Sequence, residues 1–301
     1  MERLFRSAPR CAFALFFTVI LFSACKNTPV PQALPEIPPE LSPTLVFEGI
    51  EAEGPEHLTL FFTLGIENPL PFAGRAKVGS WRVEINGRPA HSGFSLSGAE
   101  DSFPIEAEAS SLFSLVLNMD VAALAAEGLA PSDDYDVNLI LELDFSAGTA
   151  GSADSFPSLQ VSGLAAFPGV RAPGFSITAL AILKAELINT RFRVTMRIDN
   201  PNPFPVDLSA FGYELYGNGR SWADGTERNL IKIPAKSSVQ GNLFLAMNFI
   251  NMKRDLLEQI IRLQDVNYRF AGEVQVSTGV EYLPRFVTGF DLSGYSQVLE
   301  N

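Results

Sequence analysis

Short runs of alternating apolar and polar residues recur along the chain from residue 44 onward. In residues 192–198 every second residue is apolar, beginning with Phe192 and ending with Ile198. This two-residue period is typical of a β-strand that buries one face. Other short runs rich in β-branched and aromatic residues occupy residues 58–64, 81–85, 137–145, 159–164, 213–216, 266–276 and 286–292. The pattern predicts an all-β protein.

Two segments have the period of an amphipathic helix instead. In residues 249–263 the apolar residues form one stripe, made of Phe249, Met252, Leu256, Ile260 and Leu263. A shorter segment runs from Met119 to Glu127, and Gly128 is suited to end it because glycine adopts the left-handed conformation of a C′ residue. Such a stripe can bind a membrane or a partner helix, but packing on its own sheet is the more common role.

The chain contains one block twice: Asn68-Pro69-Leu70-Pro71-Phe72 and, 132 residues later, Asn200-Pro201-Asn202-Pro203-Phe204. Asn86-Gly87-Arg88 returns as Asn218-Gly219-Arg220 at the same offset. Chance repeats of short turns drift in spacing, so a constant offset indicates a duplicated domain. We therefore predict two domains, residues 44–170 and 171–301, with the boundary in the turn-rich stretch around Pro168 to Gly174.

The repeated Asn-Pro block follows a predicted strand in each copy. Proline has no N–H for the strand ladder, and asparagine before it favours a turn, so the block ends the strand and bends the chain. We expect Phe72 and Phe204 to fill the core just past the bend.

Each Asn-Gly pair lies between two predicted strands. Both central residues of a type I′ turn have positive φ, which asparagine and glycine tolerate, so each pair predicts a two-residue hairpin. Many short strands with one inserted helix in each copy indicate a β-sandwich.

The first 24 residues have the order of an export signal. Arg3, Arg6 and Arg10 precede an apolar run from Cys11 to Phe22, and the small residues Ser23 and Ala24 lead into Cys25. The run is shorter than the roughly 20 residues that a membrane-spanning helix needs. The sequence before Cys25 resembles a bacterial lipobox, although Phe22 stands where that motif prefers Leu, Val or Ile. The resemblance implies cleavage before Cys25 and acylation of this residue; an ordinary secretory signal with an incidental cysteine is the alternative.

Residues 25–43 are proline-rich and are predicted to form an extended tether. At about 3.1 Å per residue, such a stretch reaches roughly 50 Å from the membrane. Removal of residues 1–24 takes away three Arg and one Glu, which changes the net charge from −12 to −14. An acidic protein repels phosphate backbones, so nucleic acid is an improbable partner, and the acyl chains rather than charge are expected to hold the protein on a membrane of the cell envelope.

The second copy combines several features of a known family in order. They are the turn Asp199-Asn200-Pro201-Asn202-Pro203-Phe204, a predicted strand with Tyr213, the sequence Ile233-Pro234-Ala235, a predicted helix and two closing strands. It resembles the WHy domain of late embryogenesis abundant group 2 (LEA14-like) proteins. The first copy is similar but has Leu70 in place of the second asparagine. The resemblance implies two tandem immunoglobulin-like or fibronectin-III-like β-sandwiches, each with one helix, and an association with desiccation and stress tolerance. It implies no catalytic residues.

The chain has few groups that could form a catalytic or metal site. His57 and His91 lack a Cys, His or paired carboxylate at ligand spacing, and we expect both in solvated loops. Asp133, Asp134 and Asp136 lack the glycine and distal glutamate of a calcium loop, so we expect a solvated turn. We predict no enzyme, no metal and no cofactor.

Two functions fit the sequence. The first is a protective or scaffolding lipoprotein that contacts unspecified protein clients under stress. The alternative is an accessory module that captures one envelope partner or a small apolar ligand at a sheet edge or an inter-domain groove. The two differ in how many partners they bind.

Overall fold

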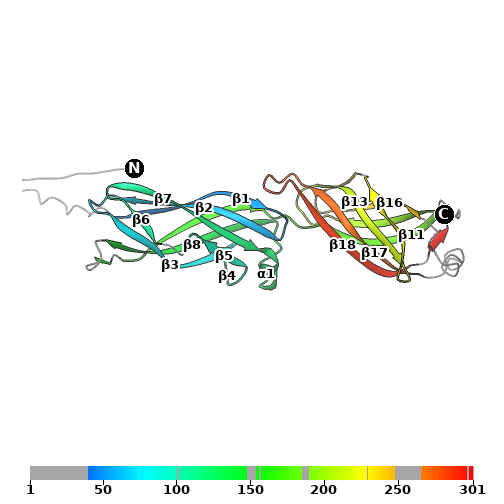
Figure 1. Cartoon of the computed structure of the whole chain (residues 1–301), viewed down its shortest axis with the longest axis horizontal. Coiled ribbons are helices and arrows are strands. Elements are labelled where there is room, and N and C mark those ends of the chain that lie inside the picture. The colour runs from blue at the N-terminus through cyan, green and yellow to red at the C-terminus, as the bar shows by residue number, and fades with distance from the viewer. Residues whose placement is uncertain are drawn as a thin grey trace, which may run out of the picture. The chain divides into compact units, whose positions relative to one another are not determined.

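The computed structural model describes residues 40–99, 102–147, 154–155, 157–184, 190–228, 230–247, 266–296 and 298–300. Residues from Pro39 onward belong to one compact unit. Almost all of the described secondary structure is β-strand, as the alternating pattern predicts (Figure 1). The signal segment, Cys25 and most of the predicted tether lie outside the described residues.

The first repeat contains two antiparallel sheets. One has the strand order β1-β2-β7-β5, with bounds Ser42–Ala52, His57–Asn68, Ala109–Asp120 and Phe94–Ser97. The other has the order β10-β8-β3-β4, with bounds Leu159–Pro168, Asp134–Ala147, Gly74–Ile85 and Arg88–Ala90. The short strands β6 (Phe103–Ile105) and β9 (Asp154–Ser155) pair with β3 and β8.

The second repeat also contains two sheets. One sheet has the order β16-β12-β11-β19, with bounds Ser238–Met247, Thr190–Asp199, Gly174–Lys184 and Val298–Glu300. In this sheet, unlike the sheets of the first repeat, the short strand β19 pairs parallel with β11. The other has the order β14-β13-β17-β18, with bounds Arg220–Glu227, Val206–Gly217, Val266–Ser277 and Arg285–Ser296; β15 (Ile231–Ile233) pairs with β13. Between the repeats, residues 169–173 connect β10 to β11 and contain no strand.

Each pair of sheets encloses its own hydrophobic cluster. In the first repeat Leu60 and Phe62 on β2 are buried together with Leu139 and Leu141 on β8. In the second repeat the cluster contains Phe192, Leu208, Phe211, Leu215 and Phe270. Because alternate residues of facing sheets point inward, the two-residue period of the sequence becomes a sandwich core. The predicted fold class, two β-sandwiches, is confirmed.

The described helix is α1 (Val121–Ala126), within the predicted segment. The Asp120 carboxylate caps it by accepting the N–H groups of Ala122 and Ala123 at 2.9 and 3.2 Å. At its other end Gly128 has φ 71°, and Leu129 N–H donates to the Leu124 carbonyl at 3.0 Å. Gly128 is therefore the C′ residue, as predicted. The predicted helix over 249–263 lies outside the described residues, and no helix in the described parts is long and apolar enough to cross a membrane.

Both Asn-Gly pairs form the predicted hairpins. Asn86 and Gly87 have φ values of 50° and 75° between β3 and β4. Asn218 and Gly219 have φ values of 49° and 75° between β13 and β14. Two successive residues with positive φ are the signature of a type I′ turn.

Candidate functional site at the junction of the two repeats

The Asn-Pro block of the second repeat is held by the buried side chain of Asn200. Its Nδ2 donates to the carbonyls of Phe204 and Pro234 at 2.8 and 3.0 Å, and its Oδ1 accepts the Asn202 N–H at 3.0 Å. An asparagine that bonds the backbone two residues on forms an Asx turn. The side chain therefore fixes the bend between β12 and β13 and ties it to the strand end at Pro234.

The first repeat uses Asn68 in the same way. Its Nδ2 donates to the carbonyls of Phe72 and Glu106 at 2.9 and 2.8 Å, and its Oδ1 accepts the Leu70 N–H at 3.0 Å. The prolines of both blocks, Pro69, Pro71, Pro201 and Pro203, lie in these bends outside the strands. The repeated motif is thus a shared turn.

The expectation that both phenylalanines fill the core is wrong for Phe72, whose side chain is 43% exposed. The buried residue beside that bend is Ile105, which pairs opposite Gly74 and is 2% exposed. Phe204 is half-buried and packs against the second hydrophobic cluster. Phe204 lies at the junction of the repeats, where it lines a cleft.

Asn202, which replaces the Leu70 of the first copy, holds the linker between the repeats. Its side chain is fully buried. Its Nδ2 donates to the Arg171 carbonyl at 2.9 Å, and its Oδ1 accepts the Arg171 N–H at 2.8 Å. The two bonds satisfy both backbone groups of one linker residue. The difference between the two copies therefore has a structural reason: the second copy has a linker to hold at this place.

Asp133 joins the first repeat to this linker and to the second repeat. Its carboxylate pairs with Lys236 Nζ at 2.6 Å and with the Arg171 guanidinium, while its carbonyl accepts the Gly169 N–H at 2.7 Å. The hydrogen bond from Lys236, and then the charge of Arg171, hold the pKa of Asp133 below its usual range. The expectation of a purely solvated acidic turn is therefore wrong for Asp133.

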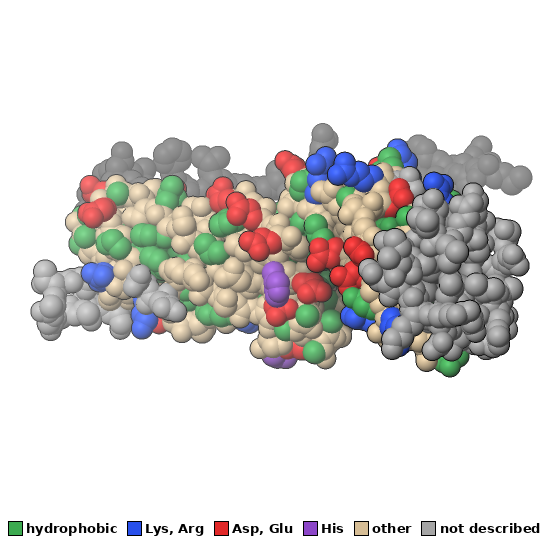
Figure 2. Space-filling view, turned by 45° about the vertical axis from the view of Figure 1, so that its right-hand side comes forward, with side chains coloured by type: hydrophobic (Ala, Val, Ile, Leu, Met, Phe, Trp, Pro, Cys, Tyr) green, Lys and Arg blue, Asp and Glu red, His purple; other side chains and the backbone are tan. Residues whose placement is uncertain are grey.

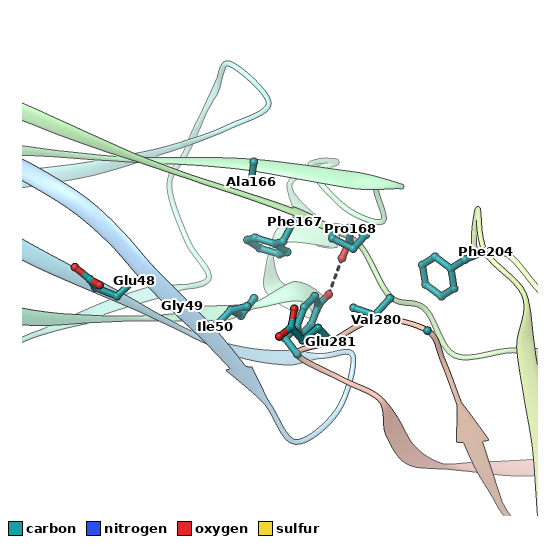
Figure 3. Close-up of a pocket in the computed structure, with 11 residues that line it drawn as sticks. Glu48, Gly49, Ile50, Ala166, Phe167, Pro168, Phe204, Val280 and Glu281 are labelled. Carbon is teal, nitrogen blue, oxygen red and sulfur yellow. Dashed lines mark hydrogen bonds between the residues drawn. The ribbon is translucent and has the colours of Figure 1, made fainter.

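Tyr282, in the loop between β17 and β18, contacts both hydrophobic clusters. Its hydroxyl donates to the Pro168 carbonyl at 2.6 Å (dashed line in Figure 3). Its ring stands edge-on to Phe167, with the ring centroids 5.8 Å apart. Burial, and next the nearby Tyr135, raise the pKa of Tyr282, so its hydroxyl stays protonated and keeps donating at physiological pH.

Beside Tyr282 lies an open cleft of about 750 Å³. Ile50 and Phe167 of the first repeat lie on one side of it and Phe204 of the second repeat lies on the other (Figure 3). Its remaining lining residues are Glu48, Gly49, Ala166, Pro168, Gly279, Val280, Glu281 and Tyr282. The lining is therefore apolar and aromatic with two carboxylates, and it contains no Lys or Arg.

The two histidines that the sequence offers as candidate metal ligands do not line this cleft. His91 lies in an exposed loop as expected, whereas His57 is the exposed first residue of β2 rather than a loop residue. Within the described ranges, no group of His, Cys, Asp or Glu side chains is arranged to hold a metal ion. Acidic side chains gather in one area of the face drawn in Figure 2, beside a histidine.

One region of the second repeat resembles a known protein family. It contains the Asn200 turn, Tyr213 and the loop with Tyr282. Residues 195–284 match the family model described as late embryogenesis abundant protein. This region is therefore LEA-like, and it spans most of the second repeat. No curated protein matches the chain significantly.

Several solved structures are distantly similar. A protein from Archaeoglobus fulgidus is 17% identical with a TM-score of 0.28, over 43% of this chain and 98% of that one. The periplasmic chaperone SfaE is 11% identical with a TM-score of 0.20, over 87% of this chain and 100% of its own. The Bacteroides uniformis β-glucuronidase is 10% identical with a TM-score of 0.22, over 77% of this chain and 26% of the enzyme. At TM-scores this low, none of these likenesses indicates a function.

Proposed function

We propose that the protein is a non-catalytic lipoprotein of the bacterial cell envelope that protects other proteins under stress by contacting them directly. The observation that carries the proposal is the LEA-like region at residues 195–284. The lipobox-like sequence before Cys25 supports an anchor made of acyl chains. The strongly acidic composition supports the role, since a high net charge keeps a protein soluble and limits self-association.

The edge strand β18 offers a contact surface for protein clients. All twelve of its residues pair with β17 without a register shift, and in the described parts of the chain no strand pairs with its other side. At two other edge strands, β1 and β14, the pairing is interrupted by a bulge, which discourages the addition of another strand. A long regular edge can accept an extended segment of another chain as an additional strand.

The side chains of β18 favour such contacts. Val287 and Tyr295 are 61% and 70% exposed. The strand carries two charged residues, Arg285 and Asp291, and Asp291 is paired with Arg269 at 2.7 Å. Edge strands that avoid association usually present unpaired charges, above all lysine. The edge of β18 therefore suits apolar client segments of varied sequence.

A protection assay tests the proposal. The chain from residue 25 onward, with Cys25→Ser to omit the anchor, is mixed with a labile enzyme that is then frozen and thawed or dried. We expect the enzyme to keep its activity at near-stoichiometric ratios, and an unrelated protein of equal net charge to give less protection. Protection no better than that of the unrelated protein would refute the protective role.

Two matched variants test the contact surface. In the first, Val287→Lys and Tyr295→Lys place lysines on the edge strand β18. In the second, Leu112→Lys and Leu230→Lys replace two similarly exposed apolar residues away from β18. We expect the first pair to reduce protection and the second pair to leave it unchanged. Equal effects of the two pairs would exclude β18 as the contact surface.

A further inference from the structure

We propose that the junction cleft binds an extended peptide segment that carries a basic residue beside apolar ones. This function goes beyond general protection, because it requires one chemistry in the ligand. It also assigns a use to a surface that side chains of both repeats line.

The size and the walls of the cleft suit such a ligand. Its volume of about 750 Å³ lies within the range of roughly 300–1,000 Å³ that is usual for binding pockets. The half-buried apolar side chains Ile50 and Phe204 provide surface that an aliphatic or aromatic ligand side chain can cover. Because three lining residues are aromatic, a cation can also lie over a ring face.

The charge of the lining selects a cation. Glu48 and Glu281 are both exposed, and no basic side chain lines the cleft to neutralise them. The net charge of −12 for the whole chain adds a long-range attraction for positively charged ligands. The two carboxylates repel an anionic ligand, whereas a lysine or arginine side chain can form an ion pair with either of them.

The open shape of the cleft favours an extended segment over a compact molecule. A compact ligand binds best in a pocket that encloses most of its surface, and this cleft is open along one side. An extended segment can lie along the cleft and place alternate side chains on its apolar and acidic lining residues.

The contacts between the repeats hold the two walls in place before a ligand arrives. Tyr282 bonds Pro168, Asn202 bonds the backbone of Arg171, and Asp133 pairs with Lys236. A site whose walls are already fixed spends less free energy on ordering when it binds.

Two glycines allow the cleft to be filled without disturbing the fold. A Cβ atom added at Gly49 or at Gly279 would meet no heavy atom within 4 Å, and neither residue has positive φ. A leucine at either position can therefore occupy the cleft. Gly54 has the same open surroundings but does not line the cleft, so Gly54→Leu is a matched control.

The experiment measures fluorescence anisotropy of a labelled Phe-Lys-Leu-Lys-Phe peptide with the chain from residue 25 onward carrying Cys25→Ser. A Phe-Glu-Leu-Glu-Phe peptide is the charge control. We expect the lysine peptide to bind at least about tenfold more tightly than the glutamate peptide, with affinity that falls as salt is added. Gly279→Leu should weaken binding about tenfold or more, while Gly54→Leu should leave it unchanged.

A charge substitution keeps the test valid if a filled cleft affects folding. Glu281→Lys should weaken binding of the lysine peptide roughly fivefold, the scale of an exposed ion pair. Glu273→Lys, at an exposed position on β17 outside the cleft, should not. Equal binding of the two peptides, or equal effects of Glu281→Lys and Glu273→Lys, would overturn the proposal. None of these outcomes depends on whether the protein protects clients.

Discussion

Replacing Asn202 with leucine, the residue that the first repeat has at this place, should destabilise the second repeat and release the linker. The fully buried Asn202 side chain bonds both the N–H and the carbonyl of Arg171. Leucine can make neither bond, so two backbone polar groups would lose their partners.

The magnitude follows from those two groups. A buried polar group without a partner costs about 1–3 kcal/mol, so the pair gives about 2–6 kcal/mol. Water that enters as the linker loosens will recover part of this. We therefore expect the free energy of unfolding of the second repeat to fall by about 2–4 kcal/mol.

Urea unfolding followed by circular dichroism measures the change. With a slope of about 2 kcal/mol per molar urea, the midpoint should fall by about 1–2 M. The reverse exchange, Leu70→Asn, is the control, because Leu70 is only half-buried and the first repeat keeps the Asn68 bonds. A loss below about 0.5 kcal/mol for Asn202→Leu, or an equal loss for Leu70→Asn, would refute the role of Asn202 in holding the linker.

Four further predictions follow from the same structure. Phe204→Ala should lower the free energy of unfolding by about 1–3 kcal/mol, and Phe72→Ala should lower it by less than about 1 kcal/mol. Both losses are smaller than the roughly 3–5 kcal/mol that truncation of a fully buried phenylalanine costs, because neither ring is fully buried. Equal losses in urea titrations would contradict the difference in burial between the two rings. Burial raises the pKa of Tyr282, so its stabilising contribution is complete below its unfolded pKa of about 10 and disappears as pH rises further; Tyr282→Phe should therefore make unfolding less sensitive to pH above 10, and an unchanged alkaline profile would count against this. The pKa of Asp133 is lowered in the folded protein, so its contribution is present above about pH 4 and is lost as pH falls further; thermal melts of Asp133→Asn should show a smaller acid-dependent loss than the unsubstituted protein. Mass spectrometry of the native protein should find Cys25 as the acylated amino terminus, and an unmodified Cys25 or a different terminus would exclude the anchor.

Local rules explain which parts of the fold could be predicted. Strand positions follow from the two-residue period, and the Asn86-Gly87 and Asn218-Gly219 turns follow from the positive φ that both residues tolerate. The C′ position of α1, at Gly128, depends on the same property of glycine. In each case the residues that decide the structure are neighbours in the sequence.

The junction could not be predicted because its partners are far apart along the chain. Tyr282 bonds a carbonyl 114 residues away, and Lys236 bonds Asp133 across 103 residues. An acidic cluster with no basic residue near it in the sequence resembles a solvated turn until folding brings a lysine to one of its members. The exchange of Leu70 for Asn202 was visible in the repeat, but its meaning depends on the linker that lies against Asn202 in three dimensions.

The error over Phe72 has a related cause. An aromatic residue after a strand-ending turn is expected to be buried, and at the equivalent position Phe204 is partly so. Ile105 and its counterpart Ile233 are both buried beside these bends, so the isoleucines do not account for the difference between the two rings. Packing decides whether a ring at such a bend is covered, and periodicity does not describe packing.

Photo-cross-linking in intact cells tests most directly whether the protein protects many clients through β18. A photoreactive amino acid replaces the exposed Val287, and the same substitution at Leu112 serves as the control. During drying or freezing, we predict that the Val287 probe captures many unrelated exported proteins, and that the Leu112 probe captures few. Capture of a single partner at Val287, or the same capture at both positions, would contradict the protective role and its proposed surface.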